Sequence, residues 1–288
     1  MFLHFNRKRI SKGLNMKIIF IGDVVGRSGR EALKKYIPEI KKDFSPDIII
    51  VNAENAVSGY GLNKKIAQEI FDLNVDVITL GNHSWDQKEM LSYIEINKNI
   101  IRPINYPAKV PGRGKILKTL TNGKKILIIQ VLLRLFVNIS LDDPFSIVNE
   151  IVNKEILGKS VDAIFIDMHG EASSEKNSFG HYFDGRVTCI LGTHTHVPSS
   201  DGRILLNKTA YQTDVGMTGD YDSVIGIQKE GPIHQFTKGY RNEGRFKPAE
   251  KEAILCGSFI ESDDNTGLAK NITMFHYGNK PSFYSNLT

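Results

Sequence analysis

Five short apolar runs in this chain each end in a polar motif, and this repeated arrangement constrains the fold more than any other feature. Continuous apolar runs of this length indicate strands that are buried on both faces, as in parallel sheets. Functional sites in such sheets form beyond the carboxyl ends of the strands, so the five motifs are expected to meet in space. The runs are IIFI, DIIIV, DVITL, DAIFI and VTCIL, and they precede GDVVG at 22–26, AEN at 53–55, GNHSWD at 81–86, DMHGE at 167–171 and GTHTHV at 192–197.

The side chains in these motifs are of the types that bind divalent metals. Carboxylates, amide oxygens and imidazoles together suit Fe, Mn or Zn. His194 and His196 are two residues apart, and in an extended segment such side chains share a face and can enter one cavity. Two metals about 3.5–4 Å apart need neighbouring ligands of this kind. The expected metal ligands are Asp23, Glu54, Asn55, Asn82, His169, His194 and His196.

Several other residues near the motifs admit more than one reading. His83 lies next to Asn82 and can stay unligated as a proton donor. Trp85 either packs its loop, which is favoured, or stacks on a base, and Asp167 is either a partner of the ligands or the last residue of a strand. His181 and Arg134 have no assigned role.

The order of elements predicts an α/β fold with two facing mixed β-sheets flanked by helices, a four-layer α-β-β-α sandwich. Strands and helices alternate up to residue 96, which demands parallel strands. Asn122-Gly123 lies between two apolar runs and predicts a β-hairpin. Pro38 is expected to kink or split the helix at 29–43, and the chain after residue 208 reads mostly as strands. Further helices are expected at 63–73, 86–96 and 143–157, and further strands at 162–167, 187–191 and 203–207.

Length and composition favour one large cytoplasmic domain. The chain has 288 residues, 41% of them hydrophobic, and a formal net charge of +5, which does not by itself predict nucleic-acid binding. No apolar run reaches the ~18 residues of a membrane span. The two cysteines form no metal or redox motif, which fits a reducing compartment. Residues 1–15 are basic without a signal-peptide pattern and are expected to be a disordered extension, so the single domain is placed at 16–288.

These motifs resemble the YmdB-like phosphodiesterases of the calcineurin-like metallophosphoesterase superfamily. The resemblance covers about residues 16–275, and it includes RPINYP at 102–107, LDDPF at 141–145, EASSEK at 171–176 and TDVGMTG at 213–219. It is specific to the YmdB-like branch, because Val25 stands at the histidine position of the wider superfamily's GDxH motif and Glu54 stands in place of its aspartate. Leu133 replaces a glycine that the family usually has.

The resemblance implies a two-metal hydrolase, with iron favoured and Mn or Zn possible. Its implied substrates are cyclic nucleotides, especially 2′,3′-cyclic nucleotides such as 2′,3′-cAMP. A metal-bound hydroxide would attack phosphorus, and His83 would protonate the leaving oxygen. Asp23, Asn55 and His196 would hold one metal and Asn82, His169 and His194 the other, with Glu54 bridging.

The resemblance also implies a homo-oligomer. RNA is a weakly supported further partner, and the lack of a long apolar run predicts no membrane partner. Two alternatives stay open. A phosphomonoesterase or 5′-nucleotidase would use the same metals, and a substrate panel would separate it from a phosphodiesterase. A non-catalytic regulatory or RNA-binding protein would be expected to lack a ligand or His83, and all eight positions are present here.

Overall fold

The structure of this chain is a computed structural model that describes residues 15–241 and 244–278. Residues 1–14 of the extension expected at 1–15 lie outside the described residues, as do residues 279–288 of the expected domain. Within the described part, no helix has both the length and the apolar character needed to cross a membrane.

One sheet has eight strands and carries the N-terminal half of the site. Strands β1, β3, β4 and β5 run parallel, and β13 pairs antiparallel with β1. The strand order is β2-β12-β13-β1-β3-β4-β5, with β14 paired to β13. The strands are β1 Lys17–Ile21, β2 Asp23–Val24, β3 Ile48–Asn52, β4 Val77–Thr79, β5 Ile100–Ile101, β12 Met217–Asp220, β13 Ala253–Ser262 and β14 Ala269–Tyr277.

The second sheet has six strands and carries the C-terminal half of the site. Strands β7, β8, β9 and β11 run parallel, and β6 forms the predicted hairpin with β7 around Asn122-Gly123. The order is β10-β11-β9-β8-β7-β6. The strands are β6 Lys115–Thr119, β7 Lys125–Leu132, β8 Ala163–His169, β9 Cys189–Thr193, β10 Arg203–Ile204 and β11 Ala210–Gln212.

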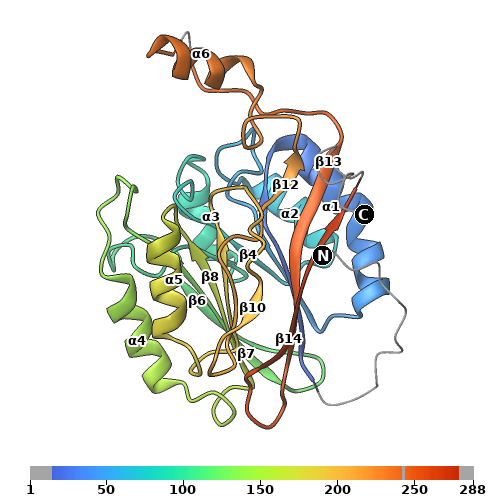
Figure 1. Cartoon of the computed structure of the whole chain (residues 1–288), viewed down its shortest axis with the longest axis vertical. Helices are drawn as coiled ribbons and strands as arrows, with labels where there is room; N and C mark the ends of the chain where they lie inside the picture. Colours follow the sequence, from blue (N-terminus) through green and yellow to red (C-terminus); the bar gives the residue numbers. More distant parts are fainter. Residues whose placement is uncertain (1–14, 242–243, 279–288) are drawn as a thin grey trace.

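Helices cover the outer face of each sheet. Figure 1 shows α4 and α5 on one side of the strands and α1 on the other, while α6 projects beyond the body. Asn63 caps α2 as predicted, because its side chain accepts a hydrogen bond from the Ile66 N–H. The helices are α1 Gly26–Phe44, α2 Lys64–Asp72, α3 Met90–Ile96, α4 Pro144–Lys154, α5 Ser173–Tyr182 and α6 Glu230–Lys238.

Successive side chains of each buried strand point to opposite faces of the sheet, and this alternation forms the apolar layers between the sheets and under the helices. In β1, Ile18 and Phe20 face the second sheet, and Phe20 meets Phe165 of β8 with ring centroids 5.0 Å apart. Ile19 and Ile21 face the opposite way, into the layer under α1, α2 and α3. A third apolar layer joins the second sheet to α4 and α5. The predicted fold of two facing mixed sheets flanked by helices is therefore confirmed.

One local prediction about helices was wrong, because the helix expected from Asp86 begins only at Met90. Of the two effects expected from Pro38, the split is absent: α1 runs unbroken from Gly26 to Phe44, and Pro38 and Lys34, the residue whose carbonyl loses a helical hydrogen bond, are both exposed to water. The regular structure after residue 208 is mostly strand, as predicted, but it also includes α6, which buries only Pro232 and so has no apolar stripe to reveal it.

Candidate metal centre

The polar motifs converge where the two sheets meet. Asp23 begins β2, Glu54 and Asn55 follow β3, and Asn82 follows β4, all in the first sheet. His169 ends β8 of the second sheet, and the segment after β9 carries His194 and His196. The structure thus brings all seven predicted ligands into one cluster. Their placement follows from the parallel order of the strands, which directs the carboxyl ends to one edge of each sheet.

His169 lies at the centre of the first group of candidate ligands. Its Nε2 is 2.9 Å from Glu54 Oε1, 2.9 Å from Asn82 Oδ1 and 3.1 Å from His194 Nδ1. Ligand atoms of Glu54, His169 and His194 all lie within 4.8 Å of one another. One N–H on His169 can serve only one of these three acceptors. The group therefore holds more lone pairs than protons, which fits a cation among them.

Each of the three histidines fixes one ring nitrogen on an oxygen outside the cluster. His169 Nδ1 is 2.8 Å from the Thr193 hydroxyl, which itself donates to Asp167 at 2.6 Å and so accepts from the imidazole. His196 Nδ1 donates to the Ile225 carbonyl at 2.8 Å. His194 Nε2 lies 3.1 Å from Glu171 Oε2. In each case the other nitrogen faces the cluster, and this is how metal-binding histidines are usually oriented.

Asp23, Asn55 and His196 form the second group. His196 Nε2 is 3.1 Å from Asn55 Nδ2 and 3.9 Å from Asp23 Oδ1. Asp23 Oδ2 accepts the backbone N–H of His194 at 3.1 Å, whereas Oδ1 is buried without a hydrogen-bond partner among the described residues. A buried, unpaired carboxylate oxygen is costly, and a cation would satisfy it. Asn55 directs its amide nitrogen at His196, so its oxygen reaches the cluster after a half-turn of the amide.

Burial and mutual charge set the protonation of the cluster. Burial raises the pKa of Glu54, but the charge and hydrogen bond of His169 outweigh burial and lower this pKa to about 2. Burial lowers the pKa of His169, and Glu54 overrides it and raises the pKa to about 9. Burial and then the charge of His169 lower the pKa of His194 to about 3. His194 is therefore neutral and offers a lone pair, while His169 must lose a proton before it can bind a metal.

The backbone approaches the cluster closely at two points. Gly81 precedes Asn82, and a Cβ there would lie 2.4 Å from Glu54 Oε2 and 2.6 Å from His169 Nε2, so only glycine fits. His194 and His196 have φ values of 103° and 65°, a region that non-glycine residues rarely adopt. Such strain persists only where surrounding contacts impose it, and it is concentrated at functional sites.

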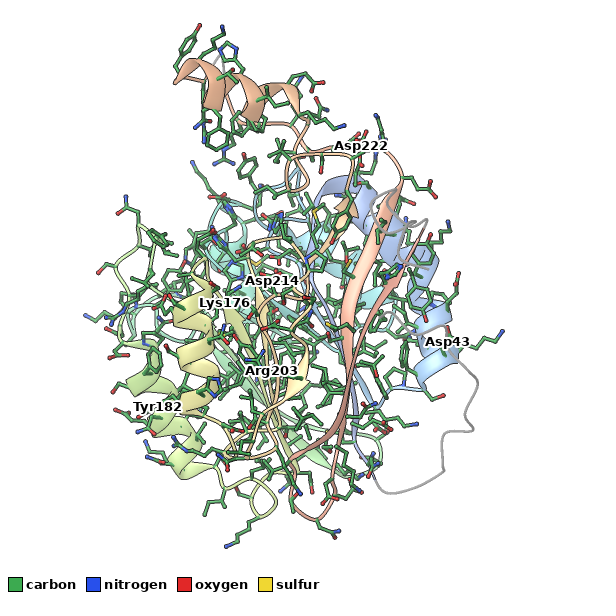
Figure 2. The ribbon with its side chains drawn as sticks, in the orientation of Figure 1. Asp43, Lys176, Tyr182, Arg203, Asp214 and Asp222 are labelled. Carbon is green, nitrogen blue, oxygen red and sulfur yellow. The ribbon has the colours of Figure 1, made fainter. Side chains whose placement is uncertain are left out.

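A buried ion pair imposes that loop conformation, and the sequence motifs gave no role to its members. Lys176 of α5 is fully buried, and its Nζ donates to the Thr193 carbonyl at 2.8 Å and to Asp214 Oδ2 at 3.0 Å. The same Asp214 oxygen accepts the Thr195 N–H at 3.0 Å. Figure 2 shows Lys176 and Asp214 close together near the centre of the molecule. They anchor the residues that flank His194 on both sides.

His83 lies at the edge of the cluster and outside the ligand contacts. Its backbone N–H donates to Glu54 Oε2 at 2.8 Å, and its Nδ1 is 2.8 Å from Asp86 Oδ2. The side chain is 30% exposed, so it can exchange protons with water or substrate. Asp86 was expected to open a helix and instead orients His83. The i, i+3 spacing of these residues was the available signal.

The other residues considered in the sequence analysis are not candidate metal ligands in the structure. Trp85 meets Tyr106 with ring centroids 6.0 Å apart, which supports the packing interpretation. His181 is exposed on α5 and is not among the clustered residues. The Arg134 side chain is exposed and its backbone N–H donates to Glu175 at 3.0 Å. Glu171 contacts His194 and was not predicted to do so.

Comparisons with known proteins agree with this architecture. Residues 19–275 match the family described as YmdB-like protein. The chain is 44% identical over 257 residues to the 2′,3′-cyclic-nucleotide 2′-phosphodiesterase of Bacillus subtilis, covering 89% of this chain and 95% of that protein.

Two crystal structures share the fold over nearly their whole length. A hypothetical protein from Thermus thermophilus superposes with a TM-score of 0.84 at 35% identity, covering 92% of this chain and 100% of that one. A structure described as a novel phosphatase from Mycoplasma pneumoniae gives 0.86 at 36% identity, covering 94% of this chain and 96% of that one. With its sequence, fold and clustered polar residues all in agreement, this chain belongs to the YmdB-like family.

Proposed function

We propose that this chain is a metal-dependent phosphodiesterase that hydrolyses cyclic nucleotides, with 2′,3′-cyclic nucleotides such as 2′,3′-cAMP as its substrates. The observation that carries the proposal is the orientation of His169, His194 and His196, each with one nitrogen fixed outward and the other facing buried carboxylates. The relative from Bacillus subtilis, named as a 2′,3′-cyclic-nucleotide 2′-phosphodiesterase, supports the choice of substrate.

The clustered residues would hold two metal ions, with Fe favoured over Mn or Zn. Bound metals would neutralise phosphate oxygens and lower the pKa of a water towards ~7. Glu54 would be shared, because it directly precedes Asn55 in the chain while its Oε1 lies 2.9 Å from His169 Nε2, and a carboxylate has two oxygens to offer. The first metal would be held with Asp23, Asn55 and His196, and the second with Asn82, His169 and His194.

His83 is proposed as the general acid of the reaction. Its Nδ1 lies 2.8 Å from Asp86 Oδ2, which orients the ring and leaves Nε2 to donate a proton to the leaving ribose oxygen. Water supplies the new P–O bond, the P–O bond to that ribose oxygen breaks, and the ring opens to a nucleoside phosphomonoester with a free ribose hydroxyl. Proton donation of this kind typically contributes about 10²–10⁴-fold to the rate.

Metal analysis of the purified chain together with a substrate panel tests this proposal. We expect about two metal ions per chain and faster turnover of 2′,3′-cAMP than of 3′,5′-cAMP or p-nitrophenyl phosphate. Chelation should abolish turnover, and adding back Fe, Mn or Zn should restore it. Full activity after complete removal of metal would refute the metal-dependent mechanism, and the absence of turnover on every cyclic nucleotide by metal-loaded protein would refute the substrate class.

A phosphomonoesterase is the second candidate, because a cluster of this kind recognises a phosphoryl group whatever its substituents. The structural relative described as a phosphatase favours its inclusion. The same panel separates the two functions. If 5′-AMP and p-nitrophenyl phosphate are hydrolysed much faster than any diester, the monoesterase assignment replaces ours.

A further inference from the structure

A pocket of about 530 Å³ lies next to His83 and outside the ligand cluster. This volume is within the range of small-molecule binding sites. Aromatic, amide and basic side chains line it, and none of them was singled out by the sequence motifs. The lining residues that the argument uses are Tyr60, Gln87, Gln228, Arg245 and Phe246.

Tyr60 joins this pocket to the candidate metal centre. Its ring meets the His83 ring edge to face, with centroids 5.5 Å apart. The loop that carries Tyr60 starts at Asn55, whose carbonyl accepts the Gly59 N–H at 3.1 Å. Ser58, Gly59 and Gly61 all have positive φ, which folds this loop back on itself beside Tyr60. The aromatic ring is therefore held at a fixed place beside the proposed general acid.

The pocket offers flat, electron-rich surfaces beside positive charge. The Arg245 guanidinium lies over the Tyr60 ring, 4.9 Å from its centroid, and comes within 4.0 Å of Asp86. Arg245 is 62% exposed, so a ligand can reach its plane from solvent. Phe246 adds a second ring to the lining. Aromatic rings and guanidinium planes are the surfaces on which nucleobases stack, and such stacking accepts any base.

Two amide side chains complete the lining. Gln87 Nε2 donates to the Tyr60 carbonyl at 2.7 Å, and Gln228 Nε2 donates to the Pro248 carbonyl at 3.2 Å. These bonds fix the amides while each keeps a second N–H and an oxygen for a ligand. Such groups match the hydrogen-bonding edge of a base. Lys247 and Glu250 also line the pocket, so its charges are mixed rather than uniformly basic as in a phosphate site.

We infer that this pocket is a nucleobase subsite, in which the base of the cyclic nucleotide stacks on the exposed plane of the Arg245 guanidinium, which the Tyr60 ring supports from the other side, while the phosphate lies at the candidate metal centre beside His83. The inference rests on the proposed function, because it assigns the part of the substrate that does not react. It makes Tyr60 a specificity residue: the base is bound on one side of His83 and the phosphodiester on the other.

The test compares 2′,3′-cAMP with methyl β-D-ribofuranoside 2′,3′-cyclic phosphate, which has the same reacting ester and no base. For the wild-type chain we expect kcat/KM to be roughly 10- to 100-fold higher for 2′,3′-cAMP, the range that stacking one base supports. Tyr60→Ala should bring this ratio close to one, whatever it does to the absolute rates. Tyr60→Phe keeps the ring and should retain the ratio.

Tyr182→Ala is the matched control, because Tyr182 is an exposed tyrosine on α5 whose ring contacts are with Phe145, Phe183 and Arg186, none of which lines the pocket. It should leave the ratio unchanged. A wild-type ratio near one, or a ratio that survives Tyr60→Ala, would overturn the subsite and leave the phosphodiesterase intact.

Binding of adenosine, measured by calorimetry, tests the subsite without turnover. If neither ester is hydrolysed, the proposed function has failed. The base subsite is then still supported if Tyr60→Ala weakens the binding of adenosine by roughly 10- to 100-fold, the range that stacking one base supports. No adenosine binding by the wild-type chain would overturn it.

Discussion

His83 differs from His169, the buried centre of the cluster, in its surroundings rather than in its chemistry. Its side chain is 30% exposed and its Nδ1 contacts a carboxylate, whereas His169 is fully buried among acceptors. A residue that exchanges protons needs a path to water and a partner that stabilises its charged form. A metal ligand needs a desolvated lone pair. The same side chain therefore has two expected uses in one site.

His83→Ala should keep both metals and lose most turnover. The loss should be about 10²–10⁴-fold for 2′,3′-cAMP and much smaller for an ester of p-nitrophenol, whose leaving group needs no proton. Metal content and kcat on both substrates are the measurements. Asp86→Asn keeps an oxygen that can still hold the His83 ring but removes the carboxylate, so it should give a smaller loss in the same direction. Stoichiometric loss of metal from His83→Ala would make His83 a ligand.

Glu54→Gln tests whether one carboxylate serves both metals. An amide cannot supply the shared negative charge, so metal content at both positions and hydrolysis should fall together, while circular dichroism stays that of a folded chain. Glu69→Gln, on the exposed side of α2, is the matched change and should alter neither. If Glu54→Gln retains both metals and near-normal turnover, Glu54 is only a strand-end residue.

At the scale of elements, helix α5 acts on the site through one side chain. Lys176 reaches from α5 beneath the strained segment after β9 and contacts Thr193 and Asp214. The left-handed residues His194 and His196 need such an anchor, because their φ values cost energy that the flanking hydrogen bonds must offset. The helix therefore contributes to the position of two candidate ligands without contributing one itself.

Lys176→Met should lower the free energy of unfolding by about 3–5 kcal/mol, because it leaves the buried Asp214 charge unpaired. Urea unfolding measures the loss of stability. Metal titration should show that the variant molecules that remain folded bind metal more weakly. Lys176→Met with Asp214→Asn removes both charges and should recover part of the stability but not the loop anchor. Arg203→Met breaks a more exposed pair with Asp201, 2.9 Å long, and should cost at most about 1 kcal/mol. Equal losses for Lys176→Met and Arg203→Met would contradict the anchoring role.

The sequence predicted the strand ends that carry the candidate ligands far better than the residues, such as Lys176 and Asp214, that hold those ends in place. Apolar runs followed by polar motifs identify strand ends, because burial on both faces leaves a composition that few other elements share. Lys176 and Asp214 give no such signal: they are 38 residues apart, and a lysine in a helix usually faces water. The late start of α3 has a similar cause, since Gln87 contacts the Tyr60 carbonyl 27 residues away while Asp86 turns back to His83, and both contacts oppose helix formation there. Local patterns cannot reveal contacts made across the fold.

At the scale of the whole molecule, the site belongs to neither sheet alone. Asp23, Glu54 and Asn82 come from the first sheet, and His169 and His194 come from the second. The apolar layer between the sheets therefore fixes the distances among ligands that share no strand. Any metal held here would also bind the two sheets to each other, so metal binding and global stability should depend on pH together.

We expect stabilisation by metal to grow as pH rises towards about 9. Glu54 raises the pKa of His169 from its usual value near 6.5 to about 9 in the metal-free fold, so this ion pair stabilises that fold fully below about 6.5 and its contribution is lost as pH rises through 9. A metal must displace the same proton, so acid favours the metal-free fold.

Calorimetry in buffers of different ionisation enthalpy should show proton release on binding at pH 7. The melting temperature gained on adding metal should be larger at pH 8 than at pH 6. A gain that is independent of pH would mean that His169 binds the metal without giving up a proton, against the geometry of its Nε2.

The distance along the chain between the two halves of the site has a kinetic consequence. Asp23 accepts the backbone N–H of His194 from 171 residues away, so the ligand set is completed only when both sheets have formed and docked. Contacts made after the rate-limiting step of folding slow unfolding and leave the folding rate unchanged. A bound metal should therefore extend the lifetime of the native chain in denaturant without shortening refolding. Removal of the metal would shorten that lifetime and leave the speed of folding as it was.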